Sequence, residues 1–203
     1  MLILRSSPAS PFGRKVKIAA AICGLSDRIE IVMGDTMDPA DSLRSQNPLG
    51  KIPILVLEDG SRLYDSRVIV EYLDAAARGG RIIPVNADAR FPALTMQALA
   101  DGLMDALLLL RYEGVYREPA MHSERWLDHQ RDKVKRAMMV FEGAPPPHGA
   151  VHVGAIALAC ALSYQDLRFA GRWRGDYPNL VRWLDEFAAA VPAFAATAPP
   201  PGA

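Results

Sequence analysis

Ser10-Pro11-Phe12-Gly13-Arg14-Lys15 decides the fold, because it comes soon after a short apolar run, Leu2-Ile3-Leu4. The apolar run predicts a buried strand. Serine is a favoured N-cap residue and proline is favoured at the first position of a helix, so a helix is expected to begin here. Gly24 gives that helix an end. The chain therefore opens with a strand that turns directly into a helix.

The next fifty residues supply the other elements of an α/β domain. The turn Glu58-Asp59-Gly60-Ser61 separates two short apolar runs and predicts a hairpin. The predicted elements are a strand over residues 29–32, a short helical or irregular piece over 39–45, hairpin strands over 54–57 and 62–64, and a helix over 65–77. Their order is β-α-β-α-β-β-α, and this domain is expected to span residues 1–78.

Residues 79–87 contain Gly79, Gly80 and Pro84 and predict a linker between domains. Residues 88–203 are expected to form an all-α domain. Its predicted helices cover residues 88–117, 123–142, 153–168 and 178–190. The sequence from Pro199 to Ala203 is rich in proline and is expected to form a tail without a helix.

Composition excludes several classes of function. The 203 residues are 50% apolar and carry 23 basic and 23 acidic side chains. With no dense basic stripe, a nucleic-acid partner is not expected. The apolar start is too short for a signal peptide, and no membrane span is expected, so a cytoplasmic protein is predicted. Cys23 and Cys160 lack metal-ligand spacing and are predicted to be core thiols.

Ser10 is the first candidate for chemistry. At the start of a helix, its hydroxyl and the first free amides point at one volume, with the positive end of the helix behind them. A thiol placed there would have a lowered pKa, and the serine could donate a hydrogen bond to the thiolate. The alternative is that Ser10 is simply the N-cap of this helix.

Two further segments could bind one extended molecule. A cis bond between Ile52 and Pro53 would turn the main chain of Ile52 outward to pair with a peptide, although a trans proline at a strand start is equally compatible with the sequence. Ser66 at the start of a helix could receive a carboxylate and Asp65 an ammonium group, or Asp65 could be an N-cap alone. A tripeptide with a central thiol and an amino-acid head would satisfy all three segments.

These segments carry a family resemblance over essentially the whole chain. The sequence resembles cytosolic glutathione S-transferases, especially bacterial members with a Ser-Pro-Phe-x-Arg-Lys segment. The matching stretches are Ser7 to Val16, Asn47 to Pro53, Asp65-Ser66-x-x-Ile69-x-Glu71-Tyr72, Ala98-Leu99-Ala100-Asp101-Gly102 and Ala159-Cys160-Ala161-Leu162-Ser163-Tyr164. The resemblance implies a thioredoxin-like first domain, a helical second domain, a homodimer and glutathione as co-substrate, with no metal.

The resemblance also assigns roles to residues. It implies Ser10 as the catalytic partner of the thiol and a cis bond before Pro53. The other implied glutathione contacts are Lys51 on the glycyl carboxylate, the main chain of Ile52 on the cysteinyl part, Asp65 and Ser66 on the γ-glutamyl head, and Asp101 on the amine across the dimer interface.

Two positions depart from the family pattern. Asp65 stands where Glu or Gln is more usual, and its shorter side chain is expected to weaken the contact with the ammonium group. The family's Ser/Thr-x-x-Asp capping box is replaced by His152-Val153-Gly154-Ala155. Because neither capping side chain is kept and Gly154 lowers helix propensity, the helix over 153–168 is expected to start poorly.

The last candidate site residues lie on one face of the helix predicted over residues 88–117. Asp101, Asp105, Leu108 and Tyr112 recur at helical spacing, and the last three are predicted to line a pocket for an apolar electrophile. The alternative is that the aspartates are simply solvated.

The leading hypothesis is therefore a glutathione transferase that presents glutathione as thiolate to a small apolar electrophile. A non-catalytic glutathione- or partner-binding module with the same fold is the alternative. A glutaredoxin-like oxidoreductase would need a cysteine in place of Ser10.

Overall fold

The strands form one mixed sheet in the order β2-β1-β3-β4. The computed structural model describes residues 1–200. The strands are β1 (Leu2–Ser6), β2 (Ile29–Met33), β3 (Ile54–Val56) and β4 (Arg62–Leu63). β1 runs parallel to β2 and antiparallel to β3, and β3 and β4 form the predicted hairpin. The predicted βαβαββα order is confirmed.

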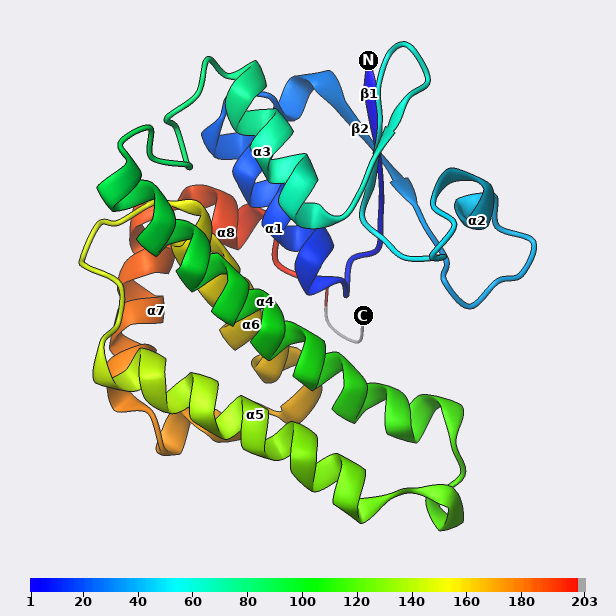
Figure 1. Cartoon of the computed structure of the whole chain (residues 1–203), viewed down its shortest axis with the longest axis vertical. Coiled ribbons are helices and arrows are strands. Elements are labelled where there is room, and N and C mark those ends of the chain that lie inside the picture. The colour runs from blue at the N-terminus through cyan, green and yellow to red at the C-terminus, as the bar shows by residue number, and fades with distance from the viewer. Residues whose placement is uncertain (201–203) are drawn as a thin grey trace.

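Helices surround the sheet unequally (Figure 1). α1 and α3 lie between the sheet and the helical domain, and α2 lies on the other side of the sheet. The helices of the first domain are α1 (Pro11–Ile22), the 3₁₀ helix η1 (Ser26–Arg28), α2 (Leu43–Gln46) and α3 (Ser66–Ala76). The short piece predicted over 39–45 is thus a single helical turn that begins later.

The second domain is helical, as predicted. It contains α4 (Ala87–Tyr116), η2 (Pro119–Met121), α5 (Glu124–Gly143), α6 (Val153–Phe169), η3 (Arg172–Gly175), α7 (Pro178–Ala190) and α8 (Pro192–Ala196). The sequence did not predict α8. The predicted tail continues beyond the described residues.

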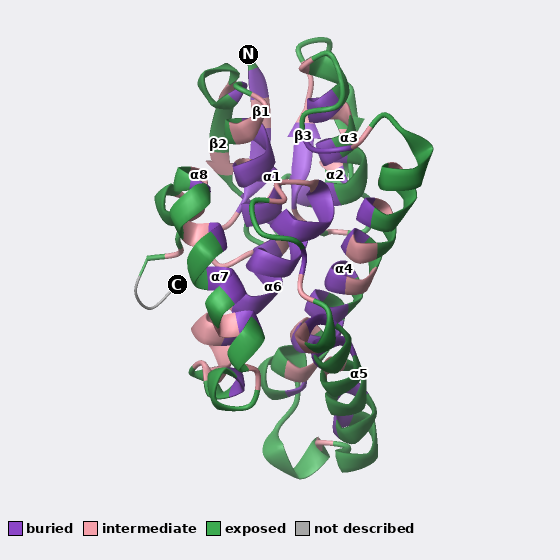
Figure 2. Cartoon of the chain, turned by 90° about the vertical axis from the view of Figure 1, so that its left-hand side faces the viewer, coloured by how far each residue is buried: buried purple, intermediate pink, exposed green. Residues whose placement is uncertain are grey.

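The two domains share one core. α6 packs against both α4 and α1. It is buried along most of its length, and Figure 2 shows most of it in purple. By length and composition α4 could cross a membrane, but in this fold it packs against α5 and α6.

The predicted linker is firmly attached to both domains. The carboxylate of Asp74, at the end of α3, accepts hydrogen bonds from the amides of residues 80–83 at 2.8–3.4 Å. Ile82 and Ile83 are buried in the shared core, and the carbonyl of Ile82 accepts from the amide of Val153 at 2.8 Å. The segment therefore connects α3 to the first turn of α6.

The prediction that α6 starts poorly is wrong. His152 is its N-cap, and the imidazole Nδ1 accepts from the amides of Gly154 at 3.2 Å and Ala155 at 3.3 Å. A Cβ on Gly154 would lie 2.7 Å from the carbonyl oxygen of Ala93 on α4. The glycine permits close helix packing, and tertiary structure supplies what the missing capping box does not.

Candidate functional site

The sheet register brings the three candidate segments to one end of the sheet. Arg5 of β1 pairs with Ile54 of β3, and Leu55 of β3 pairs with Leu63 of β4. Residues 7–10, 52–53 and 65–66 all lie just beyond these pairs, at the same end. The fold therefore gathers three separate segments from the stretch between residues 7 and 66 of the sequence.

Ser10 occupies the predicted N-cap of α1. Its Oγ accepts a hydrogen bond from the amide of Gly13 at 3.0 Å. A hydroxyl that accepts through one lone pair keeps its own proton free to donate. Capping and donation to a ligand are therefore compatible, and the two alternatives drawn from the sequence do not exclude each other.

Gly13 allows the helix start to lie close to the end of β1. A Cβ at this position would fall 2.0 Å from the Oγ of Ser6, so any side chain would displace either the helix or the strand. This close approach fixes where Ser10 stands relative to the end of the sheet.

The loop before β3 is built around buried Asn47. Its amide nitrogen donates to the carbonyl of Lys51 at 2.9 Å, and its Oδ1 accepts from the amide of Leu49 at 3.0 Å. The bond between Ile52 and Pro53 is cis, as the resemblance implies, and Ile52 lies beyond the last residue of β3 that pairs with β1. Lys51 is exposed.

Asp65 and Ser66 form the first turn of α3. Asp65 is the N-cap and its Oδ1 accepts from the amide of Arg67 at 2.9 Å. Ser66 is buried, and within residues 1–200 its hydroxyl makes no hydrogen bond. A serine hydroxyl without a protein partner at the positive end of a helix is suited to a carboxylate.

Asp101 is fully buried in a cluster with two basic side chains. Its carboxylate accepts from Lys15 Nζ at 2.7 and 2.9 Å and from Arg67 Nε at 2.9 Å. Lys15 is likewise inaccessible, and burial lowers its pKa while Asp101 raises it. The cluster links α1, α3 and α4 beneath the first turns that carry Ser10 and Ser66, and a direct contact of Asp101 with glutathione stays a prediction.

Sequence reasoning missed the roles of Lys15 and Arg67. Lys15 falls on the same helical face as the buried Ile18 and Ala19. A basic residue within an apolar stripe requires a buried acidic partner. That register could have indicated the cluster, although not the identity of its acid.

The predicted electrophile face of α4 begins next to this cluster. Burial raises the pKa of Asp105, and the nearby Asp101 raises it further, whereas Lys51 and Arg67 lower it. Leu108 is half-buried, and Tyr112 packs edge-on against Tyr116 with ring centroids 5.4 Å apart.

The end of α4 also contacts the first domain. The hydroxyl of Tyr116 donates to Sδ of Met37, in the loop after β2, at 3.0 Å. The three predicted pocket residues therefore lie on a helix that extends from the cluster of charges around Asp101 to the β2–α2 loop. None of them lines the groove between β2, α1 and α8.

The cysteines differ from each other. Cys160 is buried, and burial raises the pKa of its thiol to about 12. Cys23 is only partly buried, which corrects the prediction that both are core thiols, yet burial still raises its pKa to about 11. In the described part of the chain no cluster of three or more metal-ligating side chains is found.

Comparisons with known proteins agree with this architecture. A family model for the glutathione S-transferase N-terminal domain matches residues 9–76. The uncharacterized GST-like protein YibF of Escherichia coli K12 is 33% identical over 202 residues, which are 97% of this chain and 98% of YibF. The chain belongs to the glutathione S-transferase family.

Solved structures of relatives contain glutathione. A glutathione transferase family member from Pseudomonas fluorescens Pf-5, with bound glutathione, is 44% identical with a TM-score of 0.91, over 98% of this chain and 100% of the relative. A glutathione S-transferase from Methylobacillus flagellatus KT, with GSH bound, is 34% identical with a TM-score of 0.89 over the same shares.

Proposed function

We propose that this protein is a glutathione transferase of the serine type, active as a homodimer. The observation that carries the proposal is the hydrogen bond from the Gly13 amide to Ser10 Oγ. It fixes the hydroxyl at the positive end of α1 and leaves the proton of that hydroxyl free for a thiolate.

The remaining contacts follow the same geometry. The main chain of Ile52 pairs with the cysteinyl part of glutathione as an added strand. The γ-glutamyl carboxylate is received by the hydroxyl and amide of Ser66, with Asp65 beside the ammonium group, and Lys51 approaches the glycyl carboxylate. Pro53 holds the outward turn of Ile52, and Asp101 orients Arg67 beside the same head group.

The proposed transfer reaction depends mainly on stabilising the thiolate form of the glutathione sulfur. Ser10 donates to the thiolate and lowers the pKa of the bound thiol, so that the sulfur's electron pair is available to form a bond to carbon as the electrophile's leaving group departs. Leu108 and Tyr112 offer apolar surface for that electrophile, with Asp105 at the polar end. A relative from Pseudomonas fluorescens, 43% identical, was solved with S-(propanoic acid)-glutathione, a thioether of this kind.

Titration of bound glutathione, followed by thiolate absorbance, tests the proposal. One hydrogen bond to a charged group is worth about 1.5–3 kcal/mol, so Ser10→Ala should raise the pKa of the bound thiol by roughly one to two units. Ser7→Ala is the matched control and should leave it unchanged. An identical titration in wild type and Ser10→Ala would remove Ser10 from the thiol, whereas a normal thiolate without turnover of any model electrophile would favour the non-catalytic module.

A further inference from the structure

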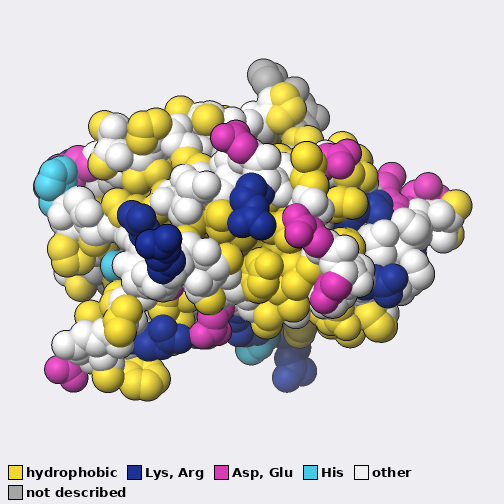
Figure 3. All heavy atoms as spheres, turned by 90° about the horizontal axis from the view of Figure 1, so that it is seen from above, with side chains coloured by type: hydrophobic (Ala, Val, Ile, Leu, Met, Phe, Trp, Pro, Cys, Tyr) yellow, Lys and Arg dark blue, Asp and Glu magenta, His cyan; other side chains and the backbone are white. Residues whose placement is uncertain are grey.

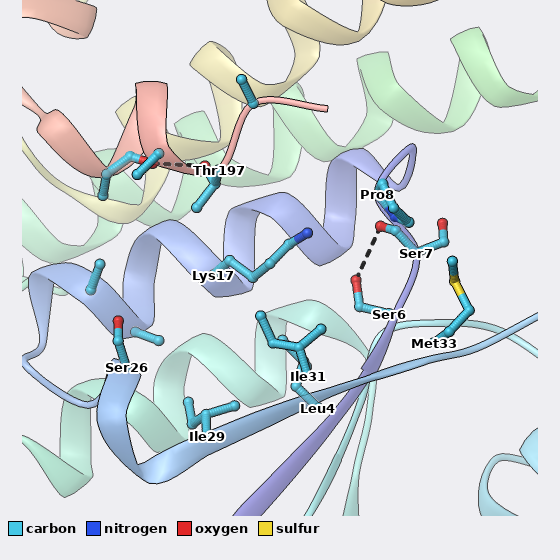
Figure 4. A pocket seen from close by; sticks show the side chains of 15 residues that line it. Leu4, Ser6, Ser7, Pro8, Lys17, Ser26, Ile29, Ile31, Met33 and Thr197 are labelled. Atoms are coloured by element: carbon cyan, nitrogen blue, oxygen red, sulfur yellow. Dashed lines mark hydrogen bonds between the residues drawn. The ribbon is translucent and has the colours of Figure 1, made fainter. Parts of the chain in front are cut away.

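An apolar groove of about 490 Å³ lies between β2, α1 and α8, on the side of α1 away from α3 (Figure 4). The volume falls within the range of small-molecule sites, about 300–1,000 Å³. Its walls come from both domains. One end of the groove reaches Ser7 and Pro8, in the loop that leads to Ser10, and the rest extends along β2.

The β2 wall consists of large apolar side chains that are left uncovered. Ile29, Ile31 and Met33 alternate along the strand and so share one face of the sheet. Ile31 is 57% and Met33 59% exposed, on an edge strand. Proteins generally protect such edges with charged residues or cover them, so exposed apolar side chains here indicate a binding surface.

The other two walls are made of small residues. Ala20 and Ala21 of α1 lie one turn beyond Lys17, and Ala193 and Ala196 line the groove from α8. Small side chains keep the space between the helices open. Arg14 fixes the α8 wall, because its guanidinium donates to the carbonyl of Phe194 at 2.6 Å and lies 4.1 Å from the centre of the Phe194 ring.

Lys17 supplies a single charge to this apolar surface. It is the one charged residue among the described residues that line the groove, and it forms no ion pair within residues 1–200. Figure 4 shows it extending from α1 between the β2 side chains and Thr197. Burial lowers the pKa of Lys17, and the positive charge of Arg14, three residues earlier on α1, lowers it further.

We propose that this groove binds an apolar carboxylate, with the carboxylate on Lys17 and the hydrocarbon along Ile31 and Met33. A carboxylate would supply the missing negative charge, while the lining would cover the apolar part of the ligand. The site goes beyond the proposed transferase function, because Asp105, Leu108 and Tyr112 are not part of it.

Calorimetric titration with octanoate, in the presence of saturating glutathione, tests the proposal, with octanol and octylamine as probes of the same chain length. Octanoate should bind at one site per chain at least tenfold more tightly than octanol, and octylamine should not bind measurably. Lys17→Met should weaken octanoate at least tenfold, Lys17→Arg should restore most of the affinity, and Lys135→Met on exposed α5 should change nothing.

A second pair of variants tests the apolar wall. Ile31→Glu should abolish octanoate binding, whereas Val140→Glu, on α5 and also 57% exposed, should leave it unchanged. Equal affinities for octanoate and octanol, or octanoate binding that survives both Lys17→Met and Ile31→Glu, would overturn the proposal. Binding that is lost in Tyr112→Ala instead would place the ligand on the α4 face. The thiolate titration with Ser10→Ala is independent of each of these outcomes.

Discussion

The first turns of α6, α1 and α3 all contain backbone amides without an acceptor inside the helix. The three helices differ in how many of these amides find an acceptor elsewhere. In α6, Val153 donates to the Ile82 carbonyl, and Gly154 and Ala155 donate to His152. In α1 the Ser10 side chain accepts from the Gly13 amide, and in α3 the Asp65 side chain accepts from the Arg67 amide.

The difference lies in which first-turn amides remain without an acceptor. Within residues 1–200 the amides of Phe12 in α1 and Ser66 in α3 donate to no other group. An unpaired amide at a helix start costs free energy unless water or a ligand accepts from it. Within residues 1–200, the first-turn amides of α6, which joins the two domains, all have acceptors. Some of those in α1 and α3, which face the candidate site, have none; we call the first turn of α6 the closed helix start and those of α1 and α3 the open helix starts.

The largest expected effect comes from the cluster beneath the open helix starts. Asp101→Asn would leave the buried Lys15 without a counter-charge, so we expect the free energy of unfolding to fall by about 3–5 kcal/mol, measured by urea denaturation. Combining it with Lys15→Met removes the uncompensated charge and should recover most of the loss. A double variant no more stable than Asp101→Asn would show that the charge pair is not the cause.

The closed helix start should be sensitive to added volume. Gly154→Ala would place a Cβ 2.7 Å from the Ala93 carbonyl oxygen and 2.7 Å from Met96 Cβ, so a loss of about 1–3 kcal/mol is expected. Gly102→Ala on α4, where a Cβ meets nothing within 4 Å, is the matched control and should be neutral or stabilise by about 0.5–1 kcal/mol. Equal denaturation midpoints for the two variants would contradict the close-packing role.

The His152 cap should make stability depend on pH. Burial lowers the pKa of His152 from its ordinary value of 6.5. His152 therefore binds a proton more readily in the unfolded chain than in the folded protein. The stability contributed by the neutral cap should be present above pH 6.5 and be lost as the pH falls below that value. His152→Asn keeps a capping oxygen that does not titrate.

Comparing urea midpoints at pH 8 and pH 5 checks this sign. The wild type should lose about 1 kcal/mol more than His152→Asn on acidification. If both proteins lose the same amount, the pH dependence arises elsewhere and the imidazole is not the acceptor.

The smallest effect is expected at the open start of α3. Because the Ser66 hydroxyl makes no hydrogen bond in the described chain, Ser66→Ala should change the free energy of unfolding by less than about 0.5 kcal/mol without ligand. Glutathione should nevertheless bind about 1–3 kcal/mol more weakly in calorimetry if this hydroxyl holds the γ-glutamyl carboxylate. A variant that loses stability but not affinity would show that Ser66 serves the fold alone.

Local signals explain what the sequence could predict. The Ser10 cap, the alternation of elements and the hairpin depend on neighbouring residues, and the structure confirms them. The His152 cap was missed because the imidazole is not a preferred capping group. The acceptor of the Val153 amide was missed because the Ile82 carbonyl lies about seventy residues away in the sequence. Likewise, the sequence shows that Lys15 needs an acid but not that Asp101 supplies it, since long-range partners are chosen by the fold.

The carboxylate of Asp74 has a consequence for exchange with solvent. Loop amides normally exchange their hydrogens for deuterium quickly, because they are bonded to water. Here four consecutive amides, from Gly80 to Ile83, share one carboxylate that is only 5% exposed. The connection between the domains should therefore exchange as slowly as the core helices, and it should open only when the two domains unfold together.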